Sequence, residues 1–301
     1  MGQTLHVKTP DSSYDILFEP GALDRMTDIL AERGLISQDG PTPRIIVGTN
    51  ETVGPLYGRP LAERLPNAAT ITLPDGEQHK TLGTAAAVYS EAVRLGLDRK
   101  GLIMALGGGV IGDTFGFIAA TYMRGVRLVQ VPTSLLAMVD ASVGGKTGLD
   151  LPEGKNLVGA FKQPALVVID TDVLATLPEA EWRCGLAEVV KHGLLADPTL
   201  LDPDLLRRAR AREFVPRAVK VKVDIVEEDP FEENIRAYLN LGHTFAHALE
   251  QISGYIWKHG EAVAVGLVAA SRLSARLGLC DPELPNQVES LLKTLGLPTR
   301  L

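Results

Sequence analysis

The chain has 301 residues, of which 45% are hydrophobic and 22% are charged. This composition is typical of soluble globular proteins, and the length leads us to expect two domains. The formal net charge of −7 argues against nucleic-acid binding, which needs a broad basic surface. The sequence has no bilayer-length apolar run and no N-terminal targeting pattern, so we expect a cytoplasmic protein without a membrane partner. Cys184 and Cys280 form no paired motif, so the sequence suggests neither a disulfide framework nor a thiolate zinc site.

Short β-branched and apolar runs recur in the first half of the chain. Between most of them lie stretches with helical spacing, such as 81–95 and 110–123. Strands that alternate with helices predict an α/β domain with a mostly parallel, Rossmann-like sheet covered on both faces. The predicted strands are RIIVG from Arg44, ATITL from Ala69, GLIMAL from Gly101, RLVQVP from Arg127 and ALVVID from Ala165.

The second half of the chain has a different pattern. After TLPEAEW, at 176–182, long helical periods follow with no convincing strand. We therefore predict an α/β domain over 1–178 and an all-α domain over 179–301, with the boundary near Pro178. The predicted helices cover 180–196, 214–227, 236–253 and 260–278.

A glycine-rich turn follows the predicted strand GLIMAL. Gly107, Gly109 and Gly112 form a G-x-G-x-x-G pattern that opens a helix. Such a turn lets a pyrophosphate approach backbone N–H groups at a helix N-terminus. The usual acidic residue about twenty positions on is absent, and the strand is not the first of the sheet. A standard Rossmann fingerprint is therefore not supported, and glycines kept only for strand–helix packing are the alternative.

Between Val131 and Phe161, polar and charged residues lie in a glycine-rich segment. An apolar run with a single acid, followed by Gly-Gly-Lys, is unlike a solvated face. Buried charges need partners, and lysine can bind phosphate or carboxylate. The alternative for each lysine alone is a surface charge. The segment contains Thr133, Ser134, Asp140, Lys146, Lys155 and Asn156.

Half of the six histidines lie in one short stretch. In a helix over 236–253, His243 and His247 would be one turn apart on the same face, and His259 would begin the next helix. A catalytic zinc site typically takes three protein ligands, and Glu188 could supply a carboxylate, with Lys191 one turn further on. Spacing alone does not decide between His247 and His259 as the third ligand, and a single histidine is more often a core or surface residue.

Several longer motifs together resemble the 3-dehydroquinate synthase family. They are GGGVIGD, YMRGV, VPTSLLAMVDASVGGKTG, GKNLVGAF, TLPEAEWRCGLAEVVKHG, RAYLNLGHTFAHALE and HGEAVAVG, and the match is collinear from about residue 7 to the end. The resemblance implies an NAD-binding α/β domain, an α-helical domain that binds metal and substrate, an active site in the cleft between them with one zinc or cobalt ion, and a homodimer.

The resemblance also implies roles for individual residues. The metal ligands would be Glu188, His243 and His259, with His247 beside the metal as a proton-handling residue. Arg124 would act across the dimer. The other substrate and catalytic positions are Asp140, Lys146, Asn156, Lys191, Lys222, Arg236 and Asn240. The NAD-binding positions are Gly107, Gly108, Gly109, Asp113, Thr133, Ser134, Lys146, Lys155 and Thr176, with Glu77 and Lys80 toward the adenosine end.

The family's reaction converts 3-deoxy-D-arabino-heptulosonate 7-phosphate to 3-dehydroquinate and phosphate in the shikimate pathway, which leads to aromatic amino acids. NAD is transiently reduced, phosphate is eliminated, the hydride returns and an aldol step closes the ring. Arg236 and Asn240 match this family better than cyclases that use sedoheptulose 7-phosphate or glucose 6-phosphate. A dehydrogenase that releases NADH is a further alternative, but that class lacks the VDASVGGKTG and GKNLVGAF combination.

Two departures from the family pattern affect these expectations. The family usually continues for some tens of residues beyond LGLPTRL and brings a further lysine to the substrate phosphate, so we expect a truncated chain. Weakened phosphate binding, or a catalytically impaired binding module, is then a further alternative. In EEDPFEEN, Pro230 and Asn234 replace more usual residues, while Glu232 still aligns with a family acid. We expect these to be tolerated loop changes that weaken the case for a role of Glu228 or Asp229.

Overall fold

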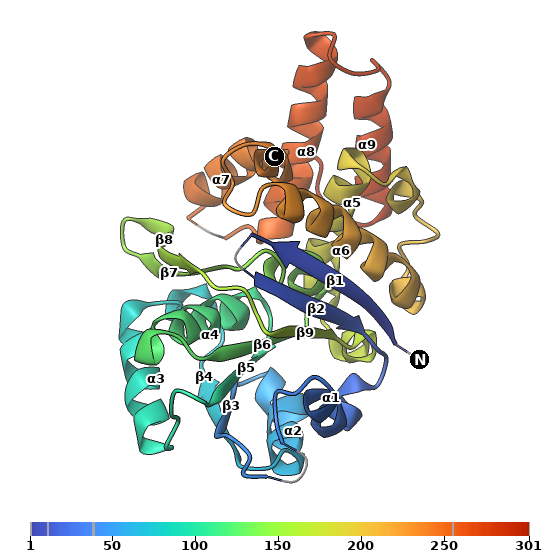
Figure 1. The fold of residues 1–301 in the computed structure, drawn as a ribbon. Coiled ribbons are helices and arrows are strands. Elements are labelled where there is room, and N and C mark those ends of the chain that lie inside the picture. Colours follow the sequence, from blue (N-terminus) through green and yellow to red (C-terminus); the bar gives the residue numbers. More distant parts are fainter. Residues whose placement is uncertain (1, 11, 38–39, 255, 301) are drawn as a thin grey trace. The chain divides into compact units, whose positions relative to one another are not determined.

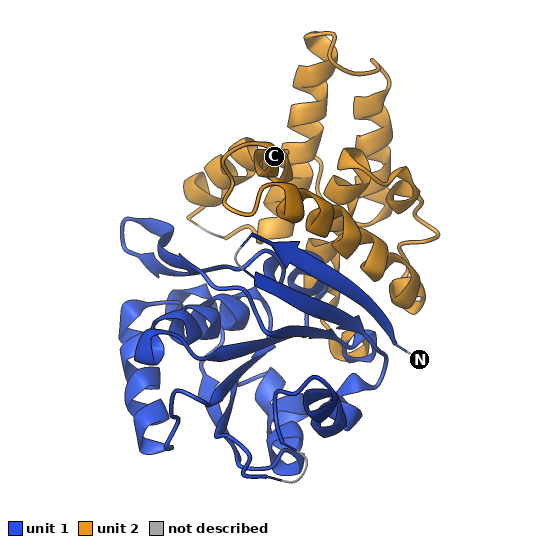
Figure 2. Ribbon diagram, viewed as in Figure 1, with its two compact units in different colours: residues 1–173 blue, residues 174–301 orange. Residues whose placement is uncertain are grey.

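The computed structural model describes residues 2–10, 12–37, 40–254 and 256–300. The chain divides into two compact units, 1–173 and 174–301 (Figure 2). The division falls a few residues before Pro178, the predicted boundary, which directly precedes the first long helix of the second unit. Each unit is described separately below.

The first unit is built on a mostly parallel sheet (Figure 1). Within the described residues the sheet has seven strands in the order β1-β2-β9-β6-β5-β3-β4. Only the edge pair β1–β2 is antiparallel among the paired strands of this sheet. The fold class predicted from the sequence is therefore confirmed for this unit. The strands are β1 (Gln3–Thr9), β2 (Ser12–Phe18), β3 (Ile45–Asn50), β4 (Ala68–Leu73), β5 (Leu102–Gly107), β6 (Arg127–Pro132) and β9 (Leu166–Ile169).

The predicted strands correspond to β3, β4, β5, β6 and β9, whereas β1 and β2 were not predicted. The side chains of β1 are mostly exposed, with Val7 as its buried residue, so this edge strand has no continuous apolar run. Helices α3 and α4 match the predicted stretches, and Phe115 of α4 is fully buried in a core with residues of the sheet. The helices of this unit are α1 (Met26–Glu32), α2 (Arg59–Arg64), α3 (Leu82–Arg94) and α4 (Gly109–Thr121).

The glycine-rich segment after β6 folds into a β-hairpin that the sequence did not predict. Strands β7 (Lys146–Leu151) and β8 (Gly154–Phe161) pair antiparallel. The hairpin packs against α4, where a Cβ on Gly116 would lie 2.4 Å from Cγ2 of Thr147. Glycine at this position therefore lets the hairpin approach the helix that follows the glycine turn.

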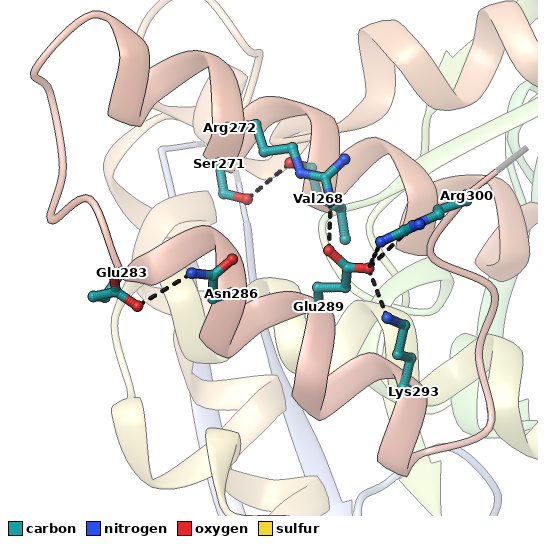
Figure 3. Close-up of polar contacts among 8 residues, drawn as sticks. All are labelled: Val268, Ser271, Arg272, Glu283, Asn286, Glu289, Lys293 and Arg300. Atoms are coloured by element: carbon teal, nitrogen blue, oxygen red, sulfur yellow. Dashed lines mark hydrogen bonds and ion pairs between the residues drawn. The ribbon is translucent and has the colours of Figure 1, made fainter.

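The second unit is helical, and no strand occurs in its described part. Its helices are α5 (Glu179–Leu195), α6 (Ala211–Glu228), α7 (His243–Ile252), α8 (His259–Arg276) and α9 (Leu284–Thr294). The prediction of an all-α second half is confirmed, although α9 was not predicted. Neighbouring helices α8 and α9 are linked through Glu289, which contacts Arg272 and Lys293 (Figure 3). Among the helices described, none combines the length and apolar character needed to cross a membrane.

The prediction of one helix over 236–253 is wrong. A short turn, Ile235–Asn240, precedes α7, and the two are separated at Gly242. This glycine has a φ of 81°, a left-handed conformation that a helix interior does not contain. A Cβ on it would also lie 2.9 Å from the backbone nitrogen of Leu267 in α8. The apolar pattern runs across this break, so periodicity alone did not show it.

Candidate metal centre and cofactor-binding turn

Three side chains of the second unit converge on one point. Glu188 comes from α5, His243 is the first residue of α7 and His259 is the first residue of α8. Each offers one ligand atom, and these atoms all lie within 4.8 Å of one another. Oε1 of Glu188 is 3.6 Å from Nε2 of His243 and 3.4 Å from Nε2 of His259. One carboxylate and two imidazoles therefore face a common centre.

Two close backbone contacts place these side chains. A Cβ on Gly260 would lie 2.3 Å from Cα of Cys184, so the start of α8 touches the backbone of α5 about one turn before the glutamate. A Cβ on Gly266 would lie 2.2 Å from the carbonyl oxygen of Gly242, so α8 also touches the start of α7. Only glycine permits such approaches. The contacts bring the ends of both histidine helices to the buried carboxylate.

The imidazoles are oriented through their other nitrogen. Nδ1 of His243 lies 3.2 Å from the carbonyl oxygen of Leu241, and Nδ1 of His259 lies 3.7 Å from Oε1 of Glu250. An acceptor near Nδ1 keeps the proton on that nitrogen and leaves the Nε2 lone pair for a metal. The donor set of two Nε2 atoms and one carboxylate oxygen therefore fits a divalent ion such as zinc or cobalt, and leaves a position for substrate.

The charges around this centre favour a cation. Glu188 is fully buried, and Lys191, which is also buried, forms an ion pair with it. Burial lowers the pKa of His243, with Glu188 acting in the opposite direction. Burial also disfavours the charged form of His259, but hydrogen bonds and charge from Glu188 and Glu250 outweigh it and raise the pKa to about 10. The carboxylates therefore stabilise positive charge at this place.

Glu250 was not predicted from the sequence, although it is only 4% exposed and faces the predicted ligand His259. A signal was present, because Glu250 follows His243 by two helical turns and so lies on the same face of α7. The structure leaves His247 outside the converging group: its ring lies beside His243, with ring centroids 5.4 Å apart. It is exposed, in contrast to His243.

The loop between α6 and α7 is organised by Asp229. Its carboxylate accepts hydrogen bonds from the backbone N–H groups of Glu233, Asn234 and Arg236, at 2.9, 2.7 and 3.0 Å. Burial opposes the charged form, but these N–H groups outweigh it and hold the pKa of Asp229 below its usual range. Asp229 therefore has a structural role that the sequence did not indicate.

The predicted substrate residues of the second unit lie around this loop and the adjoining helices. Arg236 is 2% exposed and its guanidinium donates to the carbonyl oxygen of Pro230. Asn240 donates to Oε1 of Glu232 at 3.0 Å and lines a cavity of about 330 Å³. Lys222 lies on α6 and is buried. Thr176, assigned to the cofactor, is an exposed residue just before α5.

In the first unit, the glycine turn joins β5 to α4. Packing explains Gly107, because a Cβ there would lie 2.7 Å from the side chain of Ile111. It does not explain Gly108 or Gly109, where a Cβ would meet nothing closer than 3.5 Å. Glycine at these two positions keeps the backbone accessible at a helix N-terminus, as an anionic ligand requires. The packing alternative therefore accounts for only part of the motif.

Several of the residues predicted to bind the cofactor lie next to the turn. Thr133 donates its backbone N–H to the carbonyl oxygen of Gly107 at 2.9 Å, and Oγ of Ser134 is the atom nearest to a Cβ built on Gly108. Lys80 contacts Asp113 of α4 and Asn156 of β8. The other predicted residues of this unit are Glu77 before α3, Arg124 after α4, Asp140 in the turn Ala137–Ala141, Lys146 in β7 and Lys155 in β8.

The fold and the donor set together define a class of two-domain proteins with an α/β sheet domain and a helical metal-binding domain. Among solved structures, 2-deoxy-scyllo-inosose synthase complexed with carbaglucose-6-phosphate, NAD⁺ and Co²⁺ is 27% identical, with a TM-score of 0.89 over 98% of this chain and 81% of that one. The 2-epi-5-epi-valiolone synthase of Streptomyces hygroscopicus, with NAD⁺ and Zn²⁺ bound, is 28% identical, with a TM-score of 0.86 over 98% and 83%.

The sequence matches are more specific. The family models for the 3-dehydroquinate synthase N-terminal and C-terminal regions match residues 70–184 and 185–301. The chain belongs to the 3-dehydroquinate synthase family. The 3-dehydroquinate synthase of Halorhodospira halophila is 47% identical over 99% of this chain and 84% of the relative, and that of Synechocystis is 43% identical over 100% and 86%. The predicted family and enzyme function are confirmed by these matches.

Proposed function

We propose that the chain converts 3-deoxy-D-arabino-heptulosonate 7-phosphate to 3-dehydroquinate and phosphate, with NAD at the glycine turn and zinc or cobalt held by Glu188, His243 and His259. The convergence of these three ligand atoms within 4.8 Å is the observation that carries the proposal. It is supported by the NAD⁺ and the Co²⁺ or Zn²⁺ bound in the two solved synthases. When bound, the metal supplies Lewis-acid charge for a substrate hydroxyl, and NAD accepts and returns a hydride.

The chain's own residues bind and orient the reactants. Backbone N–H groups at Gly108 and Gly109 hold the pyrophosphate of the cofactor at the start of α4. The substrate carries a carboxylate and a phosphate, which cationic side chains bind. A protein with a net charge of −7 must gather such side chains locally. We assign this role to Lys146, Lys191, Lys222 and Arg236, with Asp140, Asn156, Asn240 and Lys155 as further polar contacts.

Proton handling is assigned to His247. It lies beside His243 without joining the converging ligand group, so its imidazole remains available to exchange a proton with substrate. Because the phosphate leaves by elimination and the hydride returns to the same molecule, the protein acts mainly by positioning and charge stabilisation. NAD is regenerated in each turnover.

We also propose a cytoplasmic homodimer in which Arg124 reaches the partner's substrate. Arg124 is exposed and has a φ of 68° in the turn after α4, a conformation that costs energy and persists only where the surroundings hold it. Light scattering on the purified protein would test the dimer, and a monomeric mass at assay concentration would contradict it.

A two-signal assay tests the reaction. Purified protein, NAD, zinc and the heptulosonate phosphate are mixed, and inorganic phosphate and NADH absorbance are followed together. We expect phosphate release without accumulation of NADH, loss of release after chelation, and recovery on adding zinc or cobalt. Stoichiometric NADH would instead indicate a dehydrogenase. Full activity in metal-free protein would contradict the metal site, and Lys146→Ala should lower turnover far more than thermal stability.

A further inference from the structure

A buried ammonium group links two motifs of the first unit. Lys80 follows the short turn Glu77–His79 and is only 2% exposed. Its Nζ donates to Oδ2 of Asp113 at 2.7 Å and to Oδ1 of Asn156 at 2.5 Å. A buried charge at this depth requires such partners. Asp113 closes the glycine motif GGGVIGD, and Asn156 belongs to GKNLVGAF in the hairpin.

The backbone strengthens the same link. The carbonyl oxygen of Lys80 accepts from the backbone N–H of Asp150 at 2.7 Å, and Oδ1 of Asp150 accepts from the N–H of Asn156 at 2.7 Å. Asn156 has a φ of 56°, in the left-handed region that non-glycine residues seldom adopt. The hairpin is thus held to Lys80 through both main chain and side chain, and Asn156 takes part in both contacts.

The hydrogen-bonding chemistry of lysine fixes the orientation of the Asn156 amide. An ammonium group is a donor only, so the oxygen of the amide must face Lys80. The amide nitrogen is then directed to the opposite side, and Asn156 is exposed. Toward a ligand, this side chain can therefore offer N–H donors, which suit the carboxylate, phosphate or hydroxyl oxygens of a sugar acid phosphate.

Lys80 also compensates the charge of Asp113. A carboxylate on the helix that follows the glycine turn would repel a pyrophosphate bound there, and an ammonium at 2.7 Å offsets that repulsion. Burial favours the neutral amine, but Asp113 and Glu77 outweigh it and raise the pKa of Lys80. The ammonium therefore stays charged at neutral pH.

We propose that Lys80 is a positioning residue that neutralises Asp113 for cofactor binding and turns the Asn156 amide so that its N–H groups face the substrate. The inference deepens the proposed function and rests on it for the identity of the two ligands. It adds this indirect role to the contact with the adenosine end of NAD that the family resemblance implies.

The cofactor half of the proposal is tested by a double-mutant cycle. NAD binding is measured by calorimetry for wild type, Lys80→Met, Asp113→Asn and the double variant. We expect Lys80→Met to weaken NAD binding at least about tenfold, because it leaves a carboxylate without its buried counter-charge. In the Asp113→Asn background the same change should cost much less. An equal loss in both backgrounds would overturn the proposal and indicate direct contact with NAD.

The claim that Lys80 orients Asn156 toward the substrate is tested by a measurement that does not need enzyme activity. Hydrogen exchange of segment 146–161 should be faster in Lys80→Met than in wild type or Lys80→Arg, and no ligand is needed for this measurement. Unchanged exchange would overturn the link even if the assay confirms the enzyme, whereas an inactive wild type would remove the proposed function and leave the link intact. If Lys80→Met does not fold, Lys80→Gln, which also removes the charge, takes its place, and Lys80→Arg remains the control.

The variant Asn156→Asp distinguishes the hydrogen bond that Asn156 accepts from Lys80 from the one that its amide would donate to substrate. Its carboxylate can still accept from Lys80, so hairpin exchange should stay near wild type, but it has no N–H to donate. We expect kcat/KM for the sugar acid phosphate to fall at least about tenfold. Wild-type kcat/KM in this variant would overturn the assignment of the amide as a donor.

Discussion

Both units bury charged side chains, but they satisfy them in different ways. In the first unit the ammonium of Lys80 lies between two acceptors, Asp113 and Asn156, so the chain supplies donor and acceptors itself. In the second unit a carboxylate and two imidazole nitrogens, all electron-pair donors, face one centre. The first arrangement orients neighbouring groups. The second is suited to a metal ion, since two imidazole nitrogens and a carboxylate oxygen are ligand atoms that zinc and cobalt take.

The largest effect is expected from the shared carboxylate of the metal centre. Glu188→Gln keeps the shape of the side chain but removes its charge, so it weakens metal binding and leaves Lys191 without the charge of its ion-pair partner. We expect turnover to fall on the order of 10³-fold, equivalent to several kcal/mol of lost charge stabilisation. Metal content by mass spectrometry and phosphate release measure the two consequences.

Glu181→Gln is the matched control for that change. Glu181 lies on the same helix, is partly exposed and pairs with Lys258, and an exposed pair contributes about 0–1 kcal/mol. Metal content and turnover should therefore remain near wild type. If Glu188→Gln keeps a full complement of zinc, the Glu188 cluster is not a metal site. It would then be a buried charge network like the one around Lys80.

Elements whose pattern is local in the sequence could be predicted, whereas elements that depend on contacts between distant residues could not. Strands β3, β5 and β9 were predictable because buried parallel strands are continuous apolar runs. The hairpin was not, because its glycines and lysines resemble a loop until α4 is placed against it. Helix α7 was given the wrong start, since the left-handed residue Gly242 lies within an uninterrupted apolar pattern.

The candidate site shows the same limit. Spacing alone left His247 and His259 as equal candidates for the third ligand, and only the family resemblance favoured His259. The structure groups His259 with Glu188 because Gly260 lets α8 touch α5, a contact between residues far apart in the sequence. The buried pairing of Lys80 was missed for this reason, because Asp113 and Asn156 lie far from it in the sequence, whereas Glu250 could have been found from its helical spacing to His243.

An intermediate effect is expected from Glu250, which acts on the metal centre through His259. Glu250→Gln removes the negative charge that faces Nδ1 of this histidine, so the ring is held less firmly. Loss of such an outer partner typically costs about 10- to 100-fold in metal affinity. Zinc affinity by chelator competition measures it, together with the rise in Tm that zinc produces. Glu261→Gln, which alters the cap of α8 at Lys258, is the control and should keep wild-type affinity. Equal zinc affinities in all three proteins would show that Glu250 only fills space.

The carboxylate of Glu289 extends the comparison, because the basic side chains that pair with it lie at the surface. Among the described residues, Arg272, Lys293 and Arg300 contact Glu289 at 2.5, 2.7 and 3.2 Å (Figure 3). Glu289 itself is buried, but its partners are about half exposed or more. Solvent screens pairs of this kind, so this cluster should contribute least to stability.

Its pH dependence has a definite sign. The hydrogen bond from Lys293 lowers the pKa of Glu289 most, burial opposes it, and Arg300 lowers it further, to about 2. A carboxyl group whose folded pKa is depressed stabilises the protein above its unfolded pKa, and this contribution disappears as the pH falls toward the folded value. Glu289→Gln should therefore lower Tm at neutral pH, and the difference from wild type should close between roughly pH 4.5 and 2. Glu283→Gln, on the residue before α9 that accepts from Asn286, should show no such closing. A Tm difference that stays constant down to the acid limit would mean that Glu289 acts through packing, in which case its three cations contribute nothing measurable.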